Sequence, residues 1–140
     1  MRSEVFLDTS FAIALSAPDD YLHQRATHWA ELLETAGTRL VTTQAVMLEI
    51  GNALSKQPHR QGAVILLNAL SSDSQVEIVP LSQELYNRAF QLYCERPEKE
   101  WNFIDCVSFI VMECSGITEA LSANEHFQQA GFRALLREDQ

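Results

Sequence analysis

Four oxygen-bearing side chains stand out among the residues of this chain that could do chemistry. They lie at well-separated places in the sequence: Asp8, Glu49, Asp105 and Asn124. Carboxylate and amide oxygens suit Mg²⁺ or Mn²⁺, which keep several bound waters and accept phosphate oxygens as further ligands. The four histidines and three cysteines are scattered and show no zinc-site spacing. The residue types therefore predict a metal site built from oxygen ligands.

The first two acids also have ordinary structural interpretations. Asp8 follows a short apolar run, and its side chain could cap the helical turn after it, as could Thr9 or Ser10. Glu49 lies at the edge of the apolar stripe of a helix, where a mid-helix glutamate usually faces solvent. For both residues the structural and the functional interpretations stay open at this point.

Asp105 is the most informative of the acids. Residues 103–114 are apolar on nearly every side of a helix, a pattern typical of a buried helix. A buried ionised carboxylate needs a partner or a metal ion. Asn102 and Asp105 also have the spacing of a capping box, and both roles are compatible because a helix N-terminus favours negative charge. Asn124 can likewise cap the helix predicted to follow it.

The elements that must position these residues alternate between strand and helix. Apolar runs predict strands at residues 4–8, 39–42, 76–79 and 117–122, and a weak edge strand at 132–136. Helical periodicity and cap residues predict helices at residues 11–16, 20–36, 44–56, 82–95, 103–114 and 124–130, with Thr42 or Thr43 capping the third. Residues 57–62 are predicted to form a polar loop, followed by a helix to about residue 70. In the helix over 82–95, four side chains are predicted to point inward: Leu85, Ala89, Leu92 and Tyr93.

This alternation predicts an α/β fold in a single domain over residues 1–140. The expected architecture is a three-layer sandwich, with a central parallel sheet of four to five strands flanked by helices. In such sheets ligands bind beyond the carboxyl ends of the strands. Asp8 and Asn124 both follow predicted strands, so the metal site is expected at that edge.

The overall charge argues against nucleic acid as a partner. There are 19 acidic and 10 basic residues, giving a formal net charge of -9, whereas nucleic-acid binders usually present a basic face. A bound cation would neutralise part of this charge. No apolar stretch approaches the ~18 residues of a membrane span, and the start of the chain predicts no secretory signal. The unpaired cysteines favour a reduced, cytoplasmic protein.

Four segments taken together resemble the PIN-domain ribonucleases, a family that includes the VapC-type toxins. They are VFLDTSFAIAL, QAVMLEIGNAL, RPEKEWNFIDCVSFIVM and ITEALSANEHFQQAGF, and they cover essentially the whole chain in the family's order. The resemblance implies a PIN-like fold and Mg²⁺- or Mn²⁺-dependent hydrolysis of RNA by the toxin of a type II toxin–antitoxin pair. It further implies a basic antitoxin protein as partner, and a homodimer.

The resemblance also implies roles for individual residues. The catalytic, metal-binding acids of the family fall on Asp8, Glu49 and Asp105. The fourth acid of most relatives is Asn124 here, which keeps a neutral oxygen ligand but loses the charge. Ile104 stands where the family commonly has a hydroxyl residue.

Substrate contacts are predicted in two kinds of place. Thr9 and Ser10 are expected to hydrogen-bond a phosphate or a metal-bound water. Lys56 and Arg60, in the predicted polar loop, are expected to contact RNA phosphates, and the segment 96–101 with Trp101 is the other basic, aromatic place. The alternative interpretation of both segments is a mobile, solvated loop.

Two alternative functions follow from the same residues. Asn124 and Ile104 favour a PIN-like RNA-binding module in which metal-dependent cleavage is weakened or lost. A phosphoacceptor signalling domain is the third hypothesis, but it needs a second acid beside Asp8 and a lysine after a late strand. The sequence offers neither.

Overall fold

A five-stranded parallel sheet forms the centre of the computed structural model, which describes residues 4–138. Its strands are β1 (Glu4–Leu7), β2 (Arg39–Thr43), β3 (Val76–Val79), β4 (Glu119–Leu121) and β5 (Arg133–Ala134). They lie in the order β3-β2-β1-β4-β5, and every neighbouring pair is parallel. Because β1 is the middle strand, Asp8 lies at the centre of the carboxyl edge of the sheet.

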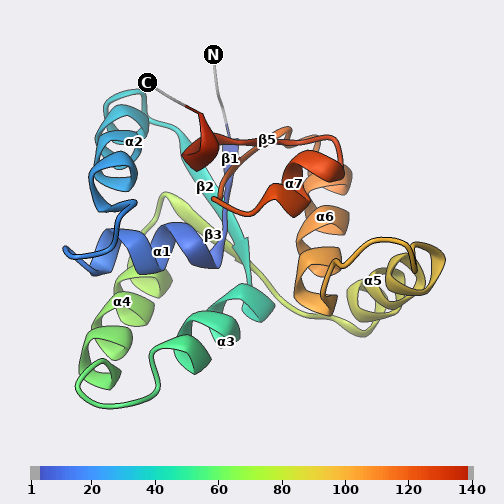
Figure 1. Cartoon of the computed structure of the whole chain (residues 1–140), viewed down its shortest axis with the longest axis horizontal. Coiled ribbons are helices and arrows are strands. Elements are labelled where there is room, and N and C mark those ends of the chain that lie inside the picture. Colours follow the sequence, from blue (N-terminus) through green and yellow to red (C-terminus); the bar gives the residue numbers. More distant parts are fainter. Residues whose placement is uncertain (1–3, 139–140) are drawn as a thin grey trace.

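Helices cover both faces of this sheet. They are α1 (Thr9–Ser16), α2 (His23–Thr35), α3 (Gln44–Ala53), α4 (Arg60–Ser72), α5 (Gln83–Glu95), α6 (Phe103–Ser115) and α7 (Glu125–Gln129). Figure 1 shows α1, α2 and α4 on one side of the sheet and α5, α6 and α7 on the other, with α3 below the sheet in that view. The predicted three-layer α/β fold is confirmed.

The core explains why β1 and α6 are so apolar. Val5, Phe6 and Leu7 are at most 1% exposed, because helices cover the sheet on both faces. Helix α6 buries seven of its residues, among them Phe109 and Met112, as its apolar surface predicted. Each fully buried side chain of this size contributes about 1.5–3 kcal/mol, so these two elements form a firm support for the acids at their ends.

Three local predictions were wrong. Helix α4 begins at Arg60, so Gly62 lies inside a helix rather than in a loop. The cost of a helical glycine, about 1 kcal/mol, is offset by the apolar residues after it, of which Ala63 is buried. Tyr93 is 47% exposed rather than inward. Residues 135–137 form a 3₁₀ turn, which leaves β5 only two residues long.

Other predicted boundaries agree within about three residues. Asp8, for example, lies just outside β1, and α3 ends at Ala53 rather than at residue 56. No helix among residues 4–138 is both long and apolar enough to cross a membrane.

Candidate functional site

Asp8 is buried at the carboxyl edge of the sheet, between β1 and α1. It is the N-cap residue of α1, but its side chain makes no capping hydrogen bond, so the capping interpretation is wrong. The carboxylate oxygen Oδ2 instead accepts hydrogen bonds from Ser122 Oγ at 2.7 Å and from Ser10 Oγ at 3.2 Å. The side chain of Asp8 is therefore held by one residue in the first turn of α1 and one residue directly after β4.

The electrostatic surroundings of Asp8 bring the three predicted acids together. Burial is the main reason why the pKa of Asp8 is raised to about 6. Hydrogen bonds from the Ser122 side chain and the Thr9 backbone oppose the increase in the pKa of this carboxyl, and the carboxylates of Glu49 and Asp105 add to it. Residues from three separate parts of the chain thus share one acidic region.

Glu49 belongs to this region through helix α3. Thr43 caps the start of α3 by accepting a hydrogen bond from Val46 N at 3.0 Å, which decides between the two predicted caps. Glu49 is partly buried, and its Oε1 accepts a short hydrogen bond from Thr9 Oγ1. The Glu49 side chain is thus tied to α1 rather than pointing freely into solvent.

Asp105 lies in the first turn of α6 and is 5% exposed. The predicted capping box is confirmed: Asp105 N donates to Asn102 Oδ1 at 2.7 Å, and Asn102 N donates to Asp105 Oδ2 at 3.2 Å. His126 Nδ1 lies 2.9 Å from the same Oδ2. The next residue, Cys106, is no nucleophile, because burial and then the charge of Asp105 raise the pKa of its thiol to about 11.

The turn after β4 and the first turn of α7 supply two residues that the sequence analysis missed, Ser122 and His126. Ser122 is fully buried and donates to Asp8, while its Oγ accepts from Asn124 N at 3.0 Å. Asn124 caps α7, since its Oδ1 accepts from His126 N at 2.9 Å. The signal that could have found Ser122 was a hydroxyl at the end of a buried strand. The direction of the His126 side chain has no such signal in the sequence.

The predicted substrate-binding residues fall into two groups. Thr9 and Ser10 lie in the acidic region, where they donate to Glu49 and Asp8. Lys56 and Arg60 are exposed in the connection from α3 to α4, and Arg60 Nε donates to Ser55 O at 2.8 Å. Among residues 4–138, no hydrogen bond or ion pair joins Lys56 or Arg60 to the acids.

The segment 96–101 is not a freely solvated loop. Trp101 is 6% exposed and donates from Nε1 to Gln129 Oε1 at 3.1 Å. The charged groups of Arg96 and Lys99 lie 5.2 and 5.8 Å from the centre of its ring, within cation–π range. These two cations therefore pack on the molecule's own tryptophan.

The donor set of the acidic region fits a hard divalent cation. Its carboxylate oxygens are ligands that Mg²⁺ and Mn²⁺ prefer. Positive charge there would offset the repulsion from Glu49 and Asp105, which adds to the effect of burial on the pKa of Asp8. Within the described part of the chain, no three His, Cys, Asp or Glu side chains are grouped to hold one ion. A cation held by one or two carboxylates and completed by water matches the usual coordination of Mg²⁺.

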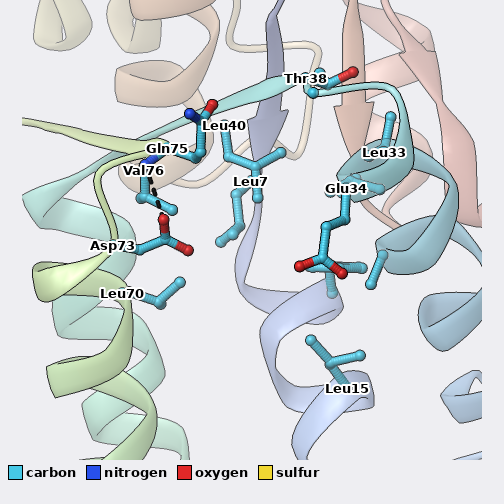
Figure 2. Close-up of a pocket in the computed structure, with 14 residues that line it drawn as sticks. Leu7, Leu15, Leu33, Glu34, Thr38, Leu40, Leu70, Asp73, Gln75 and Val76 are labelled. Carbon is cyan, nitrogen blue, oxygen red and sulfur yellow. Dashed lines mark hydrogen bonds between the residues drawn. The ribbon is translucent and has the colours of Figure 1, made fainter.

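A separate apolar cavity of about 380 Å³ lies between α1, α2, α4 and the sheet. Leu7, Leu15, Leu33 and Leu70 contribute to its walls. Figure 2 shows the carboxylates of Glu34 and Asp73 on opposite sides of this cavity, with Leu7 between them. The chemistry of this cavity is that of an apolar pocket with an acidic rim, and it differs from that of the Asp8 region.

Comparison with known proteins gives consistent results over nearly the whole chain. A family model described as the PIN domain matches residues 5–133. Over 129 residues the chain is 29% identical to the 23S rRNA-specific endonuclease VapC20 of Mycobacterium tuberculosis, covering 91% of this chain and 95% of that protein.

Solved structures agree with the sequence comparison. The crystal structure of M. tuberculosis VapC20, described as a sarcin–ricin loop cleaving toxin, matches with a TM-score of 0.81 and 27% identity, covering 91% of this chain and 95% of that one. VapBC2 from Rickettsia felis, bound to a DNA fragment from its promoter, matches with a TM-score of 0.70 and 15% identity, covering 94% and 96%. The second likeness concerns the fold alone.

Proposed function

Because the chain belongs to the PIN-domain family and is an endoribonuclease of the VapC type, we propose that it hydrolyses RNA in the acidic region around Asp8. The observation that carries this assignment is the meeting of Asp8, Glu49 and Asp105: burial raises the pKa of Asp8, and the charges of Glu49 and Asp105 add to the increase. We further propose that the cofactor is Mg²⁺ or Mn²⁺ and that the protein acts in the cytoplasm.

In this proposal the residues of the acidic region have two kinds of role, metal binding and proton acceptance. Asp8 and Asp105 would hold the cation through carboxylate oxygens, and Asn124 would add a neutral side-chain oxygen. A divalent cation bound there supplies Lewis acidity toward the phosphate and lowers the pKa of a bound water. Glu49, fixed through Oε1 by Thr9, accepts the proton of the attacking water at its other oxygen, Oε2.

The remaining predicted polar residues would orient the acids or contact the substrate. Thr9 and Ser10 hold Glu49 and Asp8 in place, and they lie where a phosphate oxygen or a bound water would be oriented. Lys56 and Arg60 contact phosphates of the RNA further from the scissile bond, where long, exposed cations act through charge rather than through fixed geometry.

Substitution of the acids by amides of the same shape tests the assignment. Asp8→Asn and Asp105→Asn should each abolish Mn²⁺-dependent cleavage of an RNA oligonucleotide, while circular dichroism shows a folded protein. The sarcin–ricin loop of 23S rRNA is the first substrate to try, because the relative VapC20 is described as cleaving it. Glu125→Gln, an exposed acid on α7, is the matched control and should cleave as the wild type does. Unchanged cleavage by both Asp variants contradicts the proposal.

A non-catalytic RNA-binding module is the second candidate, favoured by the engagement of Asn124 Oδ1 in capping α7. An assay of RNA cleavage in Mn²⁺ distinguishes the two candidate functions. Under this second function the wild-type protein binds RNA without cleaving it even in Mn²⁺, and Asn124→Asp restores cleavage.

We also propose a basic antitoxin protein as the partner. The chain carries a formal net charge of -9, and the apolar cavity between α1, α2 and α4 has Glu34 and Asp73 at its rim. An apolar side chain flanked by Lys or Arg is the complementary occupant. Induction of the wild-type gene should arrest bacterial growth, and Asp105→Asn should not.

For the oligomeric state we propose a homodimer formed through the exposed aromatic row of α5. This row consists of Tyr86, Phe90 and Tyr93, which are 46%, 49% and 47% exposed and whose rings all lie within 6 Å of the Phe103 ring. Residues 83–100 carry four acids and three bases, which disfavours RNA as the occupant of this row. A second copy of the same apolar face needs no opposite charge.

A further inference from the structure

We propose that His126 is a positioning residue that orients the Asp105 carboxylate for cation binding, an inference that rests on the proposed function. His126 is the second residue of α7, and its side chain is 22% exposed. Its ring reaches from the start of α7 to the start of α6, and Nδ1 lies 2.9 Å from Asp105 Oδ2.

The hydrogen bonds of Asp105 are divided unequally between its two oxygens. Oδ2 receives both donors, Asn102 N at 3.2 Å and His126 Nδ1. Oδ1 receives no hydrogen bond from the described residues. An ionised carboxylate only accepts, so Nδ1 carries the hydrogen in this contact. Together the two donors fix the plane of the carboxylate and leave Oδ1 as the oxygen available to a cation.

The position of His126 is itself fixed by hydrogen bonds that connect it to Asp8. Asn124 Oδ1 accepts from His126 N at 2.9 Å, Asn124 N donates to Ser122 Oγ at 3.0 Å, and Ser122 Oγ donates to Asp8 Oδ2 at 2.7 Å. A continuous path of hydrogen bonds through the β4–α7 turn therefore runs from Asp8 to Asp105. The path sets the spacing of the two carboxylates that are proposed to share the cation.

Helix capping does not account for the histidine contact. Asn102 and Asp105 complete the capping box of α6 by themselves, and Asn124 caps α7 with its own side chain. The His126 ring is additional to both caps, and what it holds is the carboxylate. Hydrogen bonds of this kind to metal-binding groups typically change metal affinity or activity by about 10–100-fold.

Two amide replacements separate positioning from packing. The side-chain nitrogen of asparagine can occupy the place of histidine Nδ1, whereas that of glutamine reaches the place of Nε2. His126→Ala and His126→Gln should weaken Mn²⁺ binding by about tenfold or more, and His126→Asn should restore most of it. The readout is Mn²⁺ affinity of the RNA-free protein by titration calorimetry, with Glu125→Ala on the same helix as the control. In RNA cleavage, kcat should fall while KM for RNA stays the same.

The outcomes are distinguishable from a failure of the proposed function. If the wild type binds Mn²⁺ and His126→Ala binds it equally well, or if glutamine restores affinity as well as asparagine, the positioning role is wrong while the metal centre stands. If the wild type itself binds no Mn²⁺, the metal centre and this inference both fail. If His126→Ala does not fold, the Mn²⁺ affinities of His126→Asn and His126→Gln still test the positioning role.

Discussion

The buried carboxyl group of Asp8 makes the folding stability of the protein depend on pH. Its pKa in the folded protein is about 6, against an ordinary value of 3.8, because burial and two neighbouring carboxylates disfavour the charged form. Folding therefore favours the protonated acid. The corresponding stability is fully present below pH 3.8 and is lost as the pH rises through about 6.

Asp8→Asn should remove this pH dependence in metal-free buffer. Above pH 7 the variant should be more stable than the wild type by about 3 kcal/mol, since one pKa unit corresponds to about 1.4 kcal/mol, and the two proteins should converge near pH 4. Urea unfolding in EDTA at several pH values measures the difference. A gap in unfolding free energy that stays constant from pH 4 to pH 8 contradicts the assignment of this pKa to Asp8.

Asn124→Asp should tighten Mn²⁺ binding at the acidic region. Aspartate caps helices as well as asparagine does, so the bond to His126 N is kept, and a full negative charge is added near the proposed cation. Titration calorimetry should show a lower Kd for Mn²⁺, with thermal stability in EDTA unchanged or reduced by repulsion. Equal Kd values for variant and wild type would show that the side chain serves only as the cap of α7.

The sequence predicted which acids meet but not how they are held. Asp8 and Asp105 were predictable because they lie at the end of a buried strand and in the first turn of a buried helix, whereas Glu49, an acid in the middle of a helix, was identified through the resemblance to the PIN-domain family. Ser122 and His126 were missed because their contacts depend on the path of the three-residue turn between β4 and α7. Tertiary structure determines which partners the side chains of such a turn contact, and the sequence of a turn has no repeating pattern from which these partners could be predicted.

Among the elements, the ends of the helices follow local chemistry most closely. Asn102 with Asp105, Thr43 and Asn124 all cap the helices that the sequence assigned to them, because caps act within three residues of themselves. The start of α4 was missed, because Gly62 is a poor helix former and only packing of the residues after it reveals the helix. Packing is a long-range effect.

Two glycines offer a matched test of these local effects. Gly116 ends α6 with φ +69°, so Gly116→Ala should destabilise the protein by about 1 kcal/mol. Gly62 lies within α4 at ordinary helical geometry, so Gly62→Ala should stabilise it by about 0.5–1 kcal/mol. A new Cβ meets nothing within 4 Å at either place, so backbone conformation alone separates them. Urea unfolding that gives the same sign for both variants contradicts this account.

For the molecule as a whole, the aromatic row of α5 is notable because its large apolar side chains are about half exposed to solvent in the single chain. Phe90→Arg should convert the proposed dimer to a monomer in size-exclusion chromatography with light scattering, because a buried unpaired charge at the centre of an interface is costly. Ile65→Arg, at a 61% exposed position on α4, is the control and should leave the oligomeric state unchanged. A wild-type monomer at high micromolar concentration contradicts the dimer.

The order of the strands has a consequence for the synthesis of the protein. β1 is made first, yet it pairs with β4, and the residues that contact Asp8 and Asp105, Ser122 and His126, follow β4 in the chain. The acidic region therefore cannot assemble until nearly the whole chain has left the ribosome. Any product that stops before β4 lacks one of the two strands that pair with β1 and one wall of the site. We therefore expect no RNA cleavage from an unfinished chain on the ribosome, or from a fragment that ends before β4.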